Sequence, residues 1–142
     1  MTAFPETFAP PTGRVVGADE FLTDGTRAVL RVTRCHACDS VWFPARPQCS
    51  SCASKNVTAE VTSSIGTTYA STVVQIGPPP FQPPYVLAYV DVDGVRVLAH
   101  AEAGGALEPG TRVELRLAEI GADADGPVQS YAVAPATEGE AK

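Results

Sequence analysis

The second half of the chain consists of short β-rich runs separated by turn signals. Residues 85–92 are almost continuously apolar and lead to the dipeptide Asp93-Gly94, which favours a two-residue hairpin turn. Residues 112–117, after the Pro109-Gly110 turn, alternate cleanly between polar and apolar side chains. Five antiparallel strands are predicted, at residues 66–74, 85–92, 95–100, 112–117 and 129–133. Strands of this number and spacing favour a small Greek-key barrel of the OB-fold type over residues 61–135.

The four cysteines lie in one short window with the spacing C-x2-C-x10-C-x2-C, at Cys35, Cys38, Cys49 and Cys52. A C-x2-C turn places two sulfurs on the same side of the backbone, so two such turns complete a tetrahedron, which is the geometry that Zn²⁺ takes with thiolates at about 2.3 Å. Four protein ligands leave no position for water or substrate. The spacing therefore predicts one structural zinc ion.

Three other interpretations of the cysteines remain open. Two disulfides would suit a secreted protein, but the first residues lack the pattern of a secretory signal. A redox dithiol needs one C-x2-C motif beside a helix start rather than two facing motifs. An iron-sulfur cluster also uses four cysteines, although its usual spacings differ. His36, between the first two cysteines, is predicted to be a solvent-exposed residue and not a ligand.

The region around the cysteines predicts a small module with little secondary structure. Residues 28–34 alternate between apolar and polar side chains and predict a strand, and residues 40–44 and 57–61 predict two shorter ones. Before them, residues 18–22 predict a short helix, with acidic residues at its start and Gly25 beyond its end. Residues 1–16 are proline-rich and predict a mobile or partner-wrapping arm.

The predicted fold class is therefore mostly β, with a short N-terminal helix, a rubredoxin-like zinc ribbon and a five-stranded OB-fold barrel. The predicted divisions are an N-terminal arm and short helix at residues 1–27, the zinc ribbon at 28–60, the barrel at 61–135 and a disordered acidic tail at 136–142.

Three aromatic residues are candidates for contact with a partner or ligand. Trp42 and Phe43 lie between the cysteine pairs, where packing beneath the ribbon is the expected role and partner contact the alternative. Phe81 lies in residues 76–84, which contain five prolines and predict a stiff, extended loop. That loop is either a rigid connector or a docking loop that presents Phe81 to a partner.

The charge distribution argues against nucleic acid as the partner. The net charge of -6 resides wholly in residues 61–142, which hold four basic and ten acidic residues, whereas phosphate binding needs a basic stripe. No run approaches the roughly 20 apolar residues of a membrane span. A cytoplasmic location is expected.

The order of these features resembles a known family, the zinc-ribbon OB-fold proteins associated with acyl-CoA metabolism. The resemblance covers roughly residues 17–135. It rests on the two cysteine pairs, Phe43-Pro44-Ala45-Arg46, Gly66-Thr67-Thr68-Tyr69, residues 83–91 with Gly94, and the Pro109-Gly110 turn before Val113. The sequence departs from the family at Asp39, where many members have glycine, which affects the turn and not the ligands.

The resemblance implies a small partner subunit of a thiolase-fold enzyme that acts on acyl-CoA thioesters, of the thiolase, acyltransferase or steroid side-chain aldolase type. It also implies that catalytic residues lie on the thiolase-fold chain. The sequence agrees, because its cysteines are all assigned to metal and neither His36 nor His100 stands in a triad pattern; His100 is expected at an exposed strand end. The alternatives are a free-standing acyl-CoA-binding module and, third, a nucleic-acid-binding OB protein.

Overall fold

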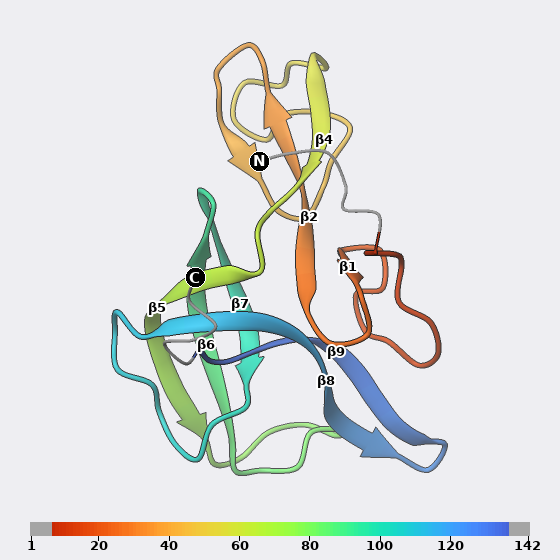
Figure 1. Ribbon diagram of the computed structural model, residues 1–142, viewed down its shortest axis with the longest axis vertical. Helices are drawn as coiled ribbons and strands as arrows, with labels where there is room; N and C mark the ends of the chain where they lie inside the picture. Colours follow the sequence, from red (N-terminus) through yellow and green to blue (C-terminus); the bar gives the residue numbers. More distant parts are fainter. Residues whose placement is uncertain (1–6, 137–142) are drawn as a thin grey trace.

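A computed structural model describes residues 7–136, which form nine strands (Figure 1). The strands are β1 (Phe21–Thr23), β2 (Ala28–Cys35), β3 (Val41–Trp42), β4 (Val57–Val61), β5 (Ile65–Val74), β6 (Tyr85–Val92), β7 (Val95–Ala101), β8 (Arg112–Asp123) and β9 (Gly126–Pro135). Among these residues no helix is long and apolar enough to cross a membrane.

Five strands close into a barrel in the order β5-β6-β7-β9-β8, which confirms the predicted OB-type architecture. The prediction of wholly antiparallel pairing is wrong at one place, because β7 and β9 are parallel where His100 pairs with Ala132. The reason is topological: after the long connection that follows β7, β8 and β9 form a hairpin, and β9 returns beside β7 in the same direction.

Two backbone features fix the barrel locally. Asp93 and Gly94 both have positive φ angles, 44° and 91°, as the predicted two-residue hairpin between β6 and β7 requires. Gly66 of β5 lies against inward side chains of β6, and a Cβ atom there would stand only 2.7 Å from Val92 and 2.8 Å from Val90. A glycine is therefore needed for β5 to close against β6.

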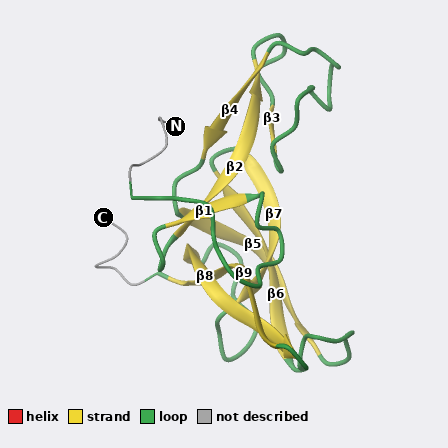
Figure 2. Ribbon diagram, turned by 90° about the vertical axis from the view of Figure 1, so that its right-hand side faces the viewer, coloured by secondary structure: helices red, strands yellow, loops and turns green. Residues whose placement is uncertain are grey.

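The long strand β2 joins the barrel to a second, narrow lobe. Its first part pairs with β1, and its second part pairs with β3 and β4. Figures 1 and 2 show β3, β4 and the end of β2 extending away from the barrel. The main core is shared between the barrel and the β1–β2 hairpin, since Phe21, Leu30 and Val32 are fully buried together with the inward side chains of β6 and β7.

The predicted helix at residues 18–22 is wrong. Gly17 has a φ of 71° and its carbonyl accepts a hydrogen bond from the Glu20 N–H, so the chain makes a turn there. Phe21 and Leu22 then enter β1 and are both buried, on opposite sides of the strand, in two hydrophobic clusters. A helix of five residues gains few hydrogen bonds for its nucleation cost, whereas pairing with β2 satisfies this backbone and buries both side chains.

The N-terminal arm is held against the chain's own strands where it is described. Ala9 pairs with Thr23, and Val15 forms a parallel bridge with Gln129 of β9. The Arg14 guanidinium donates two hydrogen bonds to Asp123, at 2.6 and 2.8 Å. The prediction of mobility is therefore wrong for residues 9–16, whereas contact of the arm with a partner stays a prediction. Residues 1–6, and residues 137–142 of the predicted tail, lie outside the described chain.

Candidate metal centre

The two C-x2-C segments fold in the same way, at the end of β2 and in the loop that follows β3. The Asp39 N–H donates to the Cys35 carbonyl at 2.9 Å, and the Ala53 N–H donates to the Cys49 carbonyl at 3.0 Å. Asp39 and Ala53 both adopt the left-handed backbone region, with φ of 62° and 66°. This position favours glycine, and Asp is among the residues that tolerate it best, so the departure at Asp39 leaves the turn intact.

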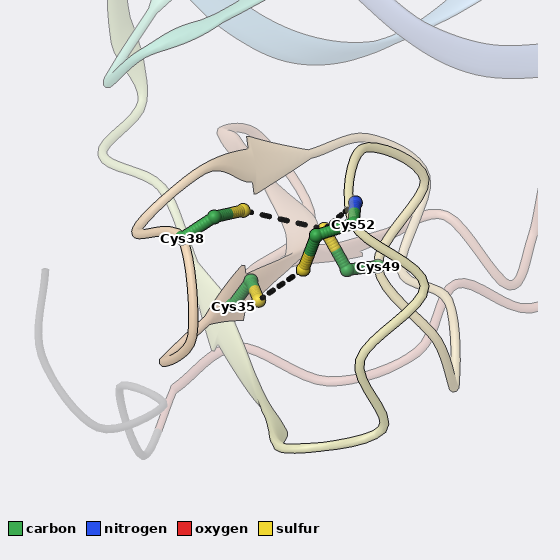
Figure 3. Close-up of side chains that lie close together, drawn as sticks. All are labelled: Cys35, Cys38, Cys49 and Cys52. Atoms are coloured by element: carbon green, nitrogen blue, oxygen red, sulfur yellow. Dashed lines mark hydrogen bonds between the residues drawn. The ribbon is translucent and has the colours of Figure 1, made fainter.

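These turns bring the four sulfurs together (Figure 3). The Sγ atoms of Cys35 and Cys52 are 3.6 Å apart, as are those of Cys38 and Cys49, and all four lie within 4.8 Å of one another. A disulfide would need about 2.05 Å, whereas four sulfurs at about 2.3 Å from a shared ion stand about 3.8 Å apart. The spacing thus fits a donor set that could hold one metal ion.

The surroundings shift the pKa values of Cys49 and Cys52 in opposite directions. A contact with the Ser40 hydroxyl, together with backbone N–H groups of Cys52 and Ser51, lowers the pKa of Cys49 to about 5. The Ser54 N–H favours the thiolate of Cys52, yet the neighbouring thiols and burial raise the pKa of Cys52 to about 12. Four adjacent thiolates repel one another, so all four ionise together only when a cation compensates their charge.

Ser40 is a residue of this site that sequence reasoning missed. Its Oγ lies 3.0 Å from the Cys38 sulfur and 3.4 Å from the Cys49 sulfur, and it accepts a hydrogen bond of 3.0 Å from the Trp42 indole N–H. Trp42 therefore orients a hydroxyl that contacts two sulfurs. A serine two residues after the second cysteine of the first pair was the available sequence signal.

The other predicted contact residues pack within the chain. The ring of Phe43 meets Tyr131 of the barrel edge-on, with centroids 5.9 Å apart, which is the packing role expected for it. Phe81 is half-buried, and its ring lies 5.9 Å from Tyr85 and 4.9 Å from His100. The loop thus folds back onto the barrel instead of presenting Phe81 outward; contact of these residues with a partner stays a prediction.

The two histidines lie far from each other in the fold. His36 is exposed on the ribbon, as predicted, and its Nε2 contacts the Thr58 hydroxyl. His100 is half-buried on β7 and stacks on Tyr85 at 5.2 Å, which corrects the expected exposed position. Burial lowers the pKa of His100, so the ring is neutral at pH 7.

Comparison with known proteins shows what parts of the chain resemble. A family model described as the C-terminal OB-fold domain of ChsH2 matches residues 60–118. A chain of the solved structure "Ltp2-ChsH2(DUF35) aldolase" shares 29% sequence identity with a TM-score of 0.57, over 76% of this chain and 85% of that chain. No curated protein matches the chain. The resemblance drawn from the sequence is thereby confirmed.

Proposed function

We propose that the chain is the non-catalytic, zinc-binding subunit of a thiolase-fold enzyme complex that acts on acyl-CoA thioesters, because residues 60–118 match the model of the ChsH2 C-terminal OB-fold domain. The observation that carries the proposal is the similarity, over most of both chains, to a chain of the Ltp2-ChsH2(DUF35) aldolase. In this role the subunit supports assembly of the complex and binding of the CoA-linked substrate. The bond-breaking step belongs to the partner.

The placement of the nucleophilic side chains supports a non-catalytic role. All four cysteines form the candidate metal centre, which leaves none for acyl transfer. The ring of His100 is stacked between aromatic neighbours, and His36 contacts a threonine on the exposed surface of the ribbon. In the part of the chain that the structure describes, neither histidine makes a recorded contact with a carboxylate that would orient it as a base.

The ribbon itself supports the assignment of zinc. Between residues 33 and 58 only Thr33, Cys35 and Cys49 are buried, so this lobe has no apolar core. A zinc ion bound there supplies a tetrahedral crosslink with no open position for substrate. Cys35 from β2 and Cys49 from the second turn would then hold two loops that packing alone does not hold. Elemental analysis of the purified chain should find one zinc per chain, and one iron would overturn the assignment.

The proposed assembly is tested with the full chain in its native host. A tagged copy should co-purify with a thiolase-fold protein identified by mass spectrometry. Deleting its gene should remove the solubility or the CoA-thioester activity of that partner. If the chain is monomeric in the extract, and its deletion leaves CoA-thioester chemistry unchanged, the proposal fails.

The alternative functions are separated by binding measurements on the isolated chain. Tight calorimetric binding of CoA esters without a partner would favour a free-standing acyl-CoA-binding module. Retardation of single-stranded DNA at low salt would favour a nucleic-acid-binding role, since that affinity depends on neutralising phosphates. The proposed subunit should show neither.

A further inference from the structure

The strand β6 has apolar side chains on both of its faces, although the barrel buries only one. The inward residues Val86, Ala88, Val90 and Val92 form the core. The outward side carries Leu87 and Tyr89, and Tyr89 pairs with Leu98 on β7. A barrel strand that faces water on its outer side normally carries polar residues there. Folding of the barrel therefore does not explain why this outer side is apolar.

The exposed apolar residues of the described chain gather on this side. Five large hydrophobic residues are exposed, and three of them, Tyr69 at 52%, Tyr89 at 49% and Leu98 at 47%, lie on β5, β6 and β7. We call Tyr69, Leu87, Tyr89, Arg96 and Leu98 the outer barrel face. A groove of about 380 Å³ crosses it, lined by Ala70, Ser71, Thr72, Leu87, Tyr89 and Leu98.

The one cation of this face is already held in place. The Arg96 guanidinium donates to Asp91 at 2.6 and 3.1 Å, and its carbon lies 3.5 Å from the centre of the Tyr69 ring. Tyr69 itself projects at a β-bulge, where the pairing of β5 with β6 shifts register. Fixing these side chains before binding reduces the entropy that an interface would otherwise lose, and Tyr and Arg dominate the energetics of protein interfaces.

The charge and size of the outer barrel face indicate what covers it. Because Asp91 neutralises Arg96, the face offers no free cation for a phosphate backbone and no net charge that burial would leave unpaired. From Leu87 to the Arg96–Asp91 pair it runs about 13 Å along β6, and three strands give it a width of about 15 Å with side chains. This area of about 200 Å² can form the apolar centre of a standard interface, which buries about 800 Å² per partner.

We propose that the outer barrel face is the docking surface for the thiolase-fold subunit. This inference rests on the proposed function, because the similar chain comes from an aldolase named for two different components, Ltp2 and ChsH2(DUF35). A neutral, aromatic surface with a prearranged arginine fits a folded protein partner, and a second copy of this chain is the competing occupant.

The test compares variants of the full chain for binding to the thiolase-fold protein identified by co-purification. Leu98→Asp places a charge at the centre of the face, and Tyr89→Ala removes an aromatic anchor without adding charge. Val16→Asp is the matched control, because Val16 is also 50% exposed but lies beside Gln129 of β9, outside the outer barrel face. Circular dichroism and thermal melting establish that each variant is folded.

The expected result is a loss of affinity of about tenfold or more for Leu98→Asp and Tyr89→Ala, with Val16→Asp unchanged. If both face variants bind the partner as the wild type does, the docking surface is overturned while the proposed function stands. If the wild-type chain forms a dimer in the absence of the thiolase-fold protein, and Leu98→Asp dissociates that dimer, a second copy covers the face and the inference is overturned. If no thiolase-fold protein binds the wild type, the proposed function itself fails.

Discussion

Replacing Cys49 with serine should open the ribbon while the barrel stays folded. Cys49 is one of the two buried cysteines of the sulfur cluster, and its loss leaves three thiolates for a metal that four would hold. Metal binding contributes about 10–16 kcal/mol in small zinc modules, which rivals the total stability of a typical domain. The barrel has a separate source of stability, since its core residues lie outside residues 33–58.

The magnitude follows from how little the ribbon buries without metal. Among residues 33–58 only Thr33 and the two cysteines Cys35 and Cys49 are buried, so the half-buried Val41 and Phe43, which pack against the barrel core, are the main apolar contacts left after the crosslink is lost. We expect the ribbon to lose at least about 4 kcal/mol of local stability, which corresponds to about three powers of ten in hydrogen-exchange protection. Protection in β6 and β7, which belong to the barrel core, should change little.

Hydrogen exchange measured by mass spectrometry checks this directly. Ser50→Ala is the control, because Ser50 is exposed in the same turn. Wild-type protein treated with a chelator should reproduce the exchange pattern of the Cys49→Ser variant. The reasoning is refuted if the ribbon stays protected in the variant, or if ribbon and barrel open in one step. A variant that stays folded and assembled with its partner but loses turnover in the complex would show that the metal is not structural.

Two further predictions concern a close approach within the barrel and the pH dependence of stability at the β1–β2 turn. Gly66→Ala should destabilise the protein by about 1–3 kcal/mol in thermal or chemical unfolding, because a Cβ atom there would overlap two valines of β6. Gly105→Ala is the control and should be neutral or slightly stabilising, because a Cβ atom there would have no neighbour within 4 Å. Equal effects of the two substitutions would contradict the close approach at Gly66. Hydrogen bonds from the Thr26 N–H, and then from Arg27, hold the pKa of Asp24 below its ordinary 3.8, so Asp24 stabilises the fold above that pH and loses this contribution as the pH falls through its folded pKa. Asp24→Asn should therefore be less stable than the wild type at pH 7 and approach it in acid, and a constant difference across that range would argue against this.

The features that the sequence predicted correctly are the ones that depend on nearby residues. The Asp93-Gly94 turn needs two adjacent positive φ angles, and its two residues are among the few that adopt them readily. The C-x2-C spacing places two sulfurs together within a single turn, so the grouping of Cys35 with Cys38 and of Cys49 with Cys52 was readable without the fold. Strand β6 was found with its observed bounds because its apolar run is long.

The errors arose where distant segments compete with local preference. The acidic start of residues 18–22 favours a helix. The segment forms a strand instead, because Phe21 pairs with Leu30 of β2 and is buried in the shared core. The arm was predicted to be mobile or to wrap a partner, but Val15 forms a parallel bridge with Gln129 of β9. Neither partner strand is near in sequence to the segment it captures, so periodicity gives no sign of it.

By itself, then, the sequence determined the candidate metal ligands, the main strands and the family resemblance, because ligand spacing, turn chemistry and β-rich runs act over a few residues. Only the tertiary structure decided that the Ser40 hydroxyl, held by the Trp42 indole, contacts two of the sulfurs and that Phe81 folds onto His100. It also decided that the apolar run of β6 has one face in the core and one in solvent. A strand's pattern shows which residues are apolar, but only the closure of the barrel determines which of them remain uncovered.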